Sequence, residues 1–247
     1  MLNSFQSYVS YIICLTVLAA APGSARGGDW PQQRYNNAKT AVVADAPPSD
    51  LKLLWSLRLA TPKSAWPASQ DRLQFDTSYS PIIAGKLLFV GSMVTDSVTA
   101  FDTETGAVKW RFYTSGPVRF APMHEKGKLY FTSDDGHLYC LNAADGKLNW
   151  KFRGGPGDRT VLGNDRLTSM WLARSSAMVF EGKVYFGAGI WPFMGTFLHC
   201  LDAETGKALW TKSGLEWQKL PHSGAVSFSS IAPQGYIAIE GDELYVP

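Results

Sequence analysis

The sequence predicts an all-β protein built from repeated four-stranded antiparallel sheets. Three observations support this: a motif that recurs three times, a second element that precedes it each time, and turn residues spread along the whole chain. The 247 residues include 23 Gly and 14 Pro, which is typical of many short strands joined by turns. With 45% hydrophobic and 13% aromatic residues, the composition is that of a folded protein.

The recurring motif reads small–apolar–Asp/Asn–x–x–Thr/Asp–Gly–x–x–x–Trp, and its copies span 100–110, 140–150 and 200–210. The three copies share an Asp or Asn, a glycine and a tryptophan, which are Asp102, Asn142 and Asp202, then Gly106, Gly146 and Gly206, then Trp110, Trp150 and Trp210. Glycine supplies the positive φ of a turn between two strands. The Asp or Asn side chain caps the same turn. We therefore assign these residues a structural role.

A second element, Gly-Lys followed by apolar residues and Phe, starts at Gly85, Gly127 and Gly182. It precedes the turn glycine by 21, 19 and 24 residues, so each repeat is one antiparallel meander. The predicted strands are 78–83, 87–91, 96–102 and 107–113 in the first unit, 119–124, 128–133, 136–142 and 147–153 in the second, and 174–180, 183–189, 196–202 and 207–213 in the third.

A four-stranded sheet alone leaves both faces wet, so such units must stack face to face around an axis, as the blades of a β-propeller do. A tryptophan at one fixed position in each unit is a natural wedge between blades. Three blades are expected, at 78–113, 119–153 and 174–213, with the start of a fourth at 235–247. Trp55 matches the last strand of a further unit. We therefore expect a partial ring.

Residues 1–25 are a different kind of sequence, without a charged side chain. An apolar stretch, 9–21, leads to Gly23 and Ala25, which fit the small-x-small pattern of a signal peptidase site. The apolar core is shorter than the roughly 20 residues that span a bilayer. We expect a signal peptide, with an uncleaved anchor as the alternative, and then an N-terminal arm at 26–50. Export to the periplasm or the medium follows, with no membrane span beyond the signal segment.

Two cysteines remain after the signal segment, Cys140 and Cys200. Each takes the position that Ala100 holds in the first repeat, six residues before the turn glycine. Because equivalent positions face their own local cores, we expect two free, buried cysteines rather than a disulfide.

The run from Ala100 to Trp110 resembles the tryptophan-docking motif of the pyrroloquinoline quinone (PQQ) repeat family, and 127–131 and 133–141 extend the resemblance. That family includes quinoprotein alcohol and glucose dehydrogenases and the propeller lipoprotein of the outer-membrane β-barrel assembly machine. The resemblance covers 51–247 and implies an exported bacterial protein, of which this chain is a truncated form, with seven or eight blades in the complete ring. It does not by itself imply a dehydrogenase, because catalytic and non-catalytic members share the repeat.

Several features of the catalytic members are missing from the sequence. There is no Cys-Cys pair for a vicinal disulfide, no Cys-x-x-Cys-His haem motif and no matched Glu/Asn/Asp calcium set. The four histidines show no metal-ligand spacing, so no metal site is predicted.

Two arginines support a sharper hypothesis. Arg119 and Arg174 each lie eight residues before a second-strand glycine, Gly127 and Gly182. In register, both begin the innermost strand of their blades and point to the mouth of a central funnel. Two guanidinium groups there suit an anion, including the tricarboxylate of PQQ. The alternative is that each pairs with a loop carboxylate such as Asp134, Asp158 or Asp165.

The first functional prediction is a non-catalytic propeller that binds or scaffolds a protein partner or a small molecule. The alternative is a PQQ-dependent dehydrogenase whose catalytic residues lie in C-terminal blades that the chain lacks. Sugar binding is a weaker third option that depends on exposed aromatic residues. Nucleic acid is not expected, because the net charge is +2 and no basic run occurs. The insertion at 154–172 is a place where function is expected, because long loops on a rigid scaffold carry it.

Overall fold

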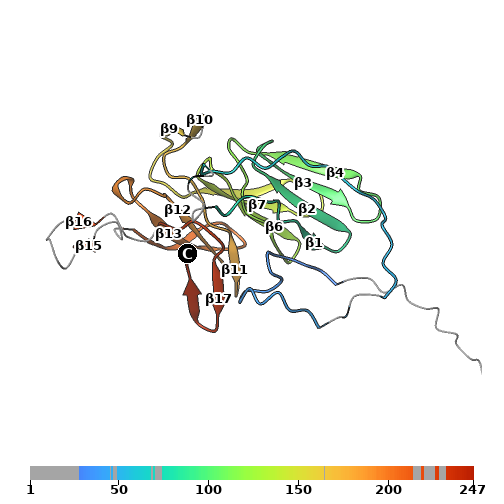
Figure 1. Ribbon diagram of the computed structural model, residues 1–247. Coiled ribbons are helices and arrows are strands. Elements are labelled where there is room, and N and C mark those ends of the chain that lie inside the picture. The colour runs from blue at the N-terminus through green and yellow to red at the C-terminus, as the bar shows by residue number, and fades with distance from the viewer. Residues whose placement is uncertain are drawn as a thin grey trace, which may run out of the picture.

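The computed structural model describes residues 28–44, 46, 49–67, 69, 74–163, 165–213, 218–219, 226–227 and 232–247. The predicted signal peptide, 1–25, lies outside these residues. Three four-stranded antiparallel sheets dominate the described part (Figure 1). In each sheet the strands are ordered as in the chain, so each sheet is a simple meander. The predicted all-β class and the four-stranded antiparallel blades are confirmed.

The strands of the three sheets follow one another in chain order. Blade 1 contains β1 (Ile82–Ala84), β2 (Leu87–Ser92), β3 (Ser97–Asp102) and β4 (Val108–Tyr113). Blade 2 contains β5 (Met123–Glu125), β6 (Lys128–Thr132), β7 (His137–Asn142) and β8 (Leu148–Arg153). Blade 3 contains β11 (Met178–Phe180), β12 (Lys183–Ala188), β13 (Phe197–Asp202) and β14 (Ala208–Lys212).

Shorter elements complete the described structure. They are the hairpin of β9 (Thr160–Gly163) and β10 (Arg166–Ser169), the 3-10 helix η2 (Pro192–Met194), the pair β15 (Gln218–Lys219) and β16 (Val226–Ser227), and the hairpin of β17 (Ala238–Glu240) and β18 (Glu243–Tyr245). The last hairpin corresponds to the predicted start of a fourth blade. Among the described residues, the structure contains no helix long and apolar enough to cross a membrane.

The sheets are stacked around a common line. The first strands of successive sheets are neighbours, β1 with β5, β5 with β11, and β11 with β17. One hydrophobic cluster joins blade 1 to blade 2, with Phe89 and Val98 packed beside Leu129 and Phe131. A second cluster joins blade 2 to blade 3 and reaches Ile239 of β17. The core is therefore made of layers between blades, as a radial arrangement requires.

The first strand of each blade is shorter than the sequence predicts. The predictions 78–83, 119–124 and 174–180 are wrong at their N-terminal ends, because the strands begin at Ile82, Met123 and Met178. Pro122 has no amide hydrogen for the ladder. Before β11, the backbone amide of Ser176 donates to Gly235 O of the next hairpin. Neither residue can therefore donate a backbone hydrogen bond to the β-ladder of its own blade.

Each motif tryptophan that has a following turn packs against that turn. A methyl group on Gly146 would lie 2.6 Å from the Trp110 ring, and one on Gly206 would lie 2.6 Å from the Trp150 ring. Trp110 Nε1 also donates to Ala143 O at 3.1 Å in blade 2. Trp55 packs on Gly106 in the same way, although 51–60 is not part of a strand.

The capping side chains accept hydrogen bonds from their own turns. Asp102 Oδ1 accepts from the amide of Thr105 at 2.9 Å, and Asp202 Oδ1 does so from Thr205 at 2.7 Å. Asn142 Oδ1 accepts from the amide of Ala144 at 2.9 Å. A hydrogen bond from Lys109, with those from Thr105, lowers the pKa of Asp102 to about 2.

The expectation of free cysteines is confirmed for the two that the structure describes. Cys140 and Cys200 are both free and buried. Cys140 pairs with Trp150 in the β7–β8 ladder, and Cys200 pairs with Trp210 in the β13–β14 ladder. Burial raises the pKa of both thiols, so they act as small apolar core residues.

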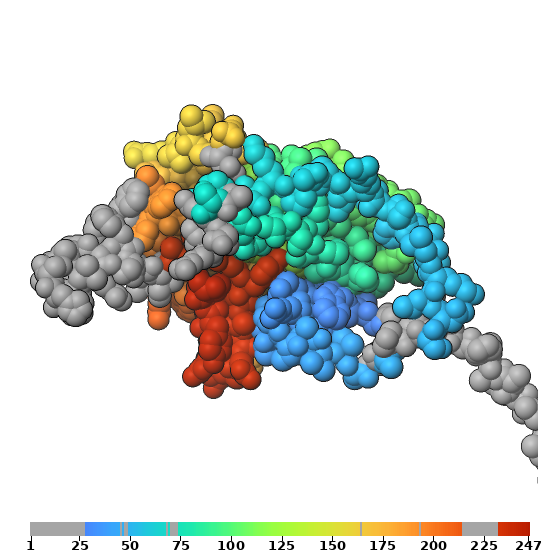
Figure 2. All heavy atoms as spheres, viewed as in Figure 1, coloured from blue at the N-terminus to red at the C-terminus, as the bar shows by residue number. Residues whose placement is uncertain are grey.

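The described residues 28–44 lie beside the C-terminal hairpin (Figure 2, blue beside red), and they hydrogen-bond to the first strands of the blades. Trp30 exchanges two backbone hydrogen bonds with β1, Pro31 O accepts one from β5, and Asn37 contacts both β11 and β17. The partners are, in order, Ile83, His124, Val179 and Ile239. The arm thus supplies hydrogen bonds to first strands that would otherwise have an open edge.

Candidate functional site

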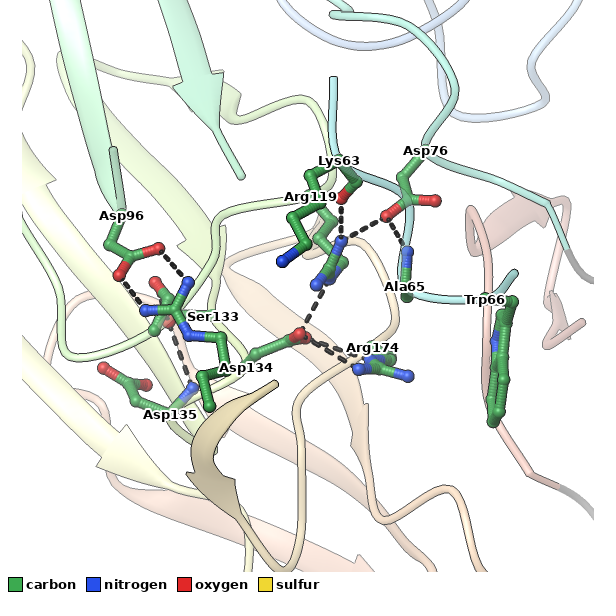
Figure 3. Close-up of polar contacts among 12 residues, drawn as sticks. Lys63, Ala65, Trp66, Asp76, Asp96, Arg119, Ser133, Asp134, Asp135 and Arg174 are labelled. Atoms are coloured by element: carbon green, nitrogen blue, oxygen red, sulfur yellow. Dashed lines mark hydrogen bonds and ion pairs between the residues drawn. The ribbon is translucent and has the colours of Figure 1, made fainter. Parts of the chain in front are cut away.

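Arg119 and Arg174 converge on one carboxylate, that of Asp134 (Figure 3). Arg119 Nε donates to Asp134 Oδ2 at 2.7 Å. Arg174 donates twice, from Nε to Oδ1 and from Nη2 to Oδ2, both at 3.1 Å. Asp134 lies in the turn between β6 and β7, whereas the arginines lie in the segments before β5 and β11. The cluster therefore joins blade 2 to blade 3.

A second carboxylate, Asp76, completes the cluster on the far side of Arg119. Arg119 Nη1 donates to Asp76 Oδ2 at 2.5 Å and to Lys63 O at 2.9 Å. Asp76 Oδ2 also accepts from the amide of Ala65 at 3.0 Å. Asp76 Oδ1 is buried without a hydrogen-bond partner among the described residues. Lys63, Ala65 and Asp76 thus enclose the outer side of the Arg119 guanidinium.

The four charged side chains are almost fully buried. Their exposed fractions are 2% for Arg119, 5% for Arg174, 1% for Asp134 and 0% for Asp76. Burial opposes ionisation of Asp134, but the charges of Arg174 and Arg119 outweigh it and hold its pKa below the usual range. Burial likewise opposes the charge of Arg119, and its two carboxylate partners outweigh that and raise its pKa. Two positive and two negative charges leave the cluster neutral.

An aromatic group borders the cluster. The Arg174 guanidinium lies 5.6 Å from the centre of the Trp66 ring, within the range of a cation–π interaction. Trp66 Nε1 donates to Gln234 Oε1 at 3.2 Å. The Trp66 ring meets Trp191 edge to face at 5.7 Å. Trp191 is 41% exposed, so this aromatic pair reaches the surface.

Arg119 and Arg174 lie close together, as their equal spacing predicts, but the prediction that they begin strands is wrong. Arg119 and Arg174 do not begin strands; each lies four residues before its strand, in a connecting segment. Both pair with a carboxylate, as the alternative interpretation stated, and the shared partner is Asp134. Asp165 instead forms an ion pair with Lys63 at 3.5 Å.

Two residues at this site, one in the cluster and one beside it, could not be predicted from the sequence. Asp76 and Trp66 belong to a segment outside the repeats, so no periodicity marks them. Only the tertiary structure brings Asp76 to Arg119, which is 43 residues further along the chain.

The cluster as it stands does not fit a tricarboxylate quinone. Both guanidinium groups already carry carboxylate partners, and their exposed fractions leave almost no surface for a second anion. Within the part of the chain that the structure describes, no group of three His, Cys, Asp or Glu side chains could hold a metal ion.

Comparison with known proteins gives the family. A family model, PQQ_2, described as outer membrane protein assembly factor BamB, matches residues 39–213. The chain belongs to this family. The PQQ_2 match covers all three complete blades and part of the N-terminal arm, and it agrees with the resemblance read from the repeat motif.

Curated relatives include quinone-dependent alcohol dehydrogenases and a tetrathionate hydrolase. The quinohemoprotein alcohol dehydrogenase of Comamonas testosteroni is 28% identical over 209 residues, which cover 76% of this chain and 26% of the relative. The dehydrogenase subunit of the quinone alcohol dehydrogenase of Gluconobacter oxydans is 26% identical over 214 residues, which cover 79% and 26%. The chain therefore spans about a quarter of the length of these relatives.

Solved structures support the propeller fold. The crystal structure of the Comamonas testosteroni enzyme matches with a TM-score of 0.53 and 24% identity, over 80% of this chain and 29% of that one. A europium-containing methanol dehydrogenase matches with a TM-score of 0.51 and 19% identity, over 75% and 32%. At these identities the likeness concerns the fold.

Proposed function

We propose that this chain is an exported, non-catalytic PQQ-repeat propeller that acts as a binding or scaffolding module. The observation that carries the proposal is the neutral cluster of Arg119, Arg174, Asp134 and Asp76. A charged ligand would have to displace buried ion pairs to reach these guanidinium groups, at a cost of several kcal/mol. The cluster is better suited to holding blades 2 and 3 together than to binding an anion.

Titration of the full chain with PQQ in the presence of calcium tests this proposal. The nine tryptophans provide an intrinsic fluorescence signal for binding. We expect no saturable quenching and no turnover of alcohols in a dye-linked assay. Saturable binding of PQQ that is lost in the Arg119→Ala/Arg174→Ala double variant would contradict the proposal, provided that the variant keeps its unfolding midpoint.

The second candidate is a PQQ-dependent dehydrogenase. It is favoured by the names of the curated relatives and by the convergence of Arg119 and Arg174 beside the innermost strands. This candidate requires catalytic residues beyond those described, and it requires Asp76 and Asp134 to release the guanidinium groups. Saturable binding of PQQ in the titration above would favour this second candidate.

We further propose that the repeat residues dock the blades within 51–247. In this proposal Trp110, Trp150 and Trp210 pack between blades, each against the glycine turn of the next blade. The contacts of Trp55, Trp110 and Trp150 with Gly106, Gly146 and Gly206 support this assignment. The units are those expected from the sequence, 78–113, 119–153 and 174–213, with a further unit starting at 235.

Export is proposed from residues 1–25. Cell fractionation of a tagged chain is expected to recover it outside the cytoplasm in a form that lacks the first 25 residues. Cytoplasmic recovery of the full-length chain would contradict this.

A further inference from the structure

The connection between blades 2 and 3 is longer than the fold requires. Nine residues, 114–122, join β4 to β5, whereas 24 residues, 154–177, join β8 to β11. Both segments do the same topological job, because each leads from the last strand of one blade to the first strand of the next. The additional residues include the β9–β10 hairpin, which is therefore not needed to connect the two blades.

The hairpin is held in a defined place by ion pairs at its turn. The Arg166 guanidinium contacts both carboxylate oxygens of Asp96, in the turn between β2 and β3 of blade 1. In the turn of the hairpin itself, Asp165 Oδ2 lies 3.5 Å from Lys63 Nζ. At its base, the amide of Ser169 donates to Asp134 O at 3.2 Å. The hairpin therefore reaches back along blade 2 to blade 1 (Figure 1).

A pocket of about 280 Å³ lies between the hairpin and blade 2. In the β7–β8 ladder, His137 is opposite Arg153 and Tyr139 is opposite Lys151. Directly opposed residues point to the same face of a sheet, so these four side chains form one wall. The facing side includes Thr160, Leu167 and Ser169, which share one face of the hairpin, together with Ser115, Gly157, Asp158 and Thr168.

Asp135, the acidic residue on the blade side of the pocket, already accepts hydrogen bonds from three neighbouring groups. Asp135 Oδ2 accepts from Tyr139 Oη at 2.6 Å and from the amide of Ser115 at 3.1 Å. Asp135 Oδ1 accepts from the amide of His137 at 3.0 Å. Figure 3 shows Asp134 directed towards Arg174 and its neighbour Asp135 directed away from it. Consecutive carboxylates thus serve two separate sites.

The cations of the pocket have no such partners. Lys151 and Arg153 are exposed, and neither forms an ion pair within the described part of the chain. They lie two residues apart on β8, so both point to the same face. Two acidic residues, Asp135 and Asp158, also line the pocket. An incoming anion would meet the Lys151 ammonium and the Arg153 guanidinium beside residues that carry hydroxyl groups.

We infer that this pocket binds a small carboxylate that also carries hydroxyl groups, such as a sugar acid. The guanidinium of Arg153 matches a planar carboxylate with two parallel hydrogen bonds. The serine and threonine hydroxyls both donate and accept, which suits the hydroxyl groups of a sugar. The volume lies at the lower end of ligand pockets, which selects a monosaccharide. The inference holds for either proposed function, because the pocket is separate from the Arg119 cluster.

Calorimetric titration of the full chain with D-glucuronate tests the inference. We expect saturable binding to the wild-type chain, with D-glucose and acetate at least 10-fold weaker, because each lacks half of the recognised chemistry. The Lys151→Gln/Arg153→Gln variant is expected to lose at least 10-fold in affinity while it keeps its unfolding midpoint, because both side chains are exposed. Arg111→Gln is the matched control: Arg111 holds the position of Lys151 in blade 1, outside the hairpin, and its loss is expected to leave affinity unchanged.

The hairpin itself provides a second variant. Arg166→Gln removes the ion pair with Asp96 and is expected to weaken glucuronate binding and to speed amide exchange in β9 and β10. Absence of saturable glucuronate binding would overturn the inference, as would equal affinity in the Lys151/Arg153 variant. Equal affinities for acetate and glucuronate would overturn the role given to the hydroxyl groups.

Discussion

The two outer strands β8 and β14 carry the same motif, but they have different surroundings. Trp150 of β8 packs on Gly206, and its indole nitrogen donates to Ala203 O and Glu204 O. Trp210 of β14 is 38% exposed, and its described ring contacts come from Tyr185 and Lys212 within blade 3. The motif tryptophan thus lies against the turn of the following blade in β8, and it is partly exposed in β14.

The boundary between blades 2 and 3 also holds the buried ion cluster and Tyr130, whose hydroxyl donates to Ala203 O at 3.0 Å. The outer side of blade 3 shows no such set within the described residues. Substitutions at this boundary should therefore be costly, and equivalent substitutions at β14 should not.

The largest effect is expected at the inner end of the boundary. Asp134→Asn leaves two buried guanidinium groups without their shared countercharge, and we expect a loss of about 3–5 kcal/mol in the free energy of unfolding. Urea denaturation followed by fluorescence measures it. Asp165→Asn is the control, because an exposed pair with Lys63 contributes under about 1 kcal/mol. Equal effects of the two variants would refute a structural role for the cluster.

A somewhat smaller effect is expected at the outer end. Trp150→Ala removes an indole packed between blades and should cost about 3 kcal/mol. Trp210→Ala should cost under about 1 kcal/mol, because its ring is partly exposed. The same denaturation series compares them. If both cost the same, the wedge acts within its own blade and the comparison fails.

The turn glycines separate backbone strain from packing. Gly127 and Gly146 have similar φ values of +75° and +71°, but a methyl group at Gly127 meets nothing within 4 Å. Gly127→Ala should therefore cost about 1 kcal/mol for its backbone conformation alone. Gly146→Ala also collides with Trp110 and should cost about 2–3 kcal/mol. Equal losses of stability in thermal unfolding would show that the Trp110 ring moves aside without cost.

The smallest effect depends on pH. His199 Nε2 donates to Gly154 O at 2.8 Å, and the ring stacks on Phe186 at 4.9 Å. Burial lowers the pKa of His199 below its ordinary value of 6.5. The unfolded chain therefore takes up a proton at a higher pH than the folded chain does. Stability is full above about pH 6.5 and falls as the pH drops towards 5.5, by at most about 1.4 kcal/mol for this one proton.

The control for the pH effect is His199→Asn. We expect this variant to be less stable at every pH but to lose the extra decline below about pH 6.5, as measured by unfolding midpoints at pH 7.5 and 5.5. An unchanged decline would assign the effect to other groups.

Much of the fold was open to prediction from the sequence, because the repeat encodes it locally. The turn glycines, the capping Asp and Asn residues and the alternation of the strands all act over a few residues, so the three meanders and the free cysteines followed from them. The start of β11 did not, because the amide of Ser176 before it donates to Gly235 O of a distant hairpin. The convergence of Arg119 and Arg174 followed from equal spacing in two repeats.

What the sequence by itself determined is therefore the identity of each blade and the positions of its wedge and its turn. What only the tertiary structure decided is which charges meet. Asp76 reaches Arg119 from an irregular segment, and Arg166 reaches Asp96 across a whole blade. The physical reason is one of range: turns and strands are set by neighbours along the chain, whereas an ion pair between distant segments depends on the three-dimensional path of both.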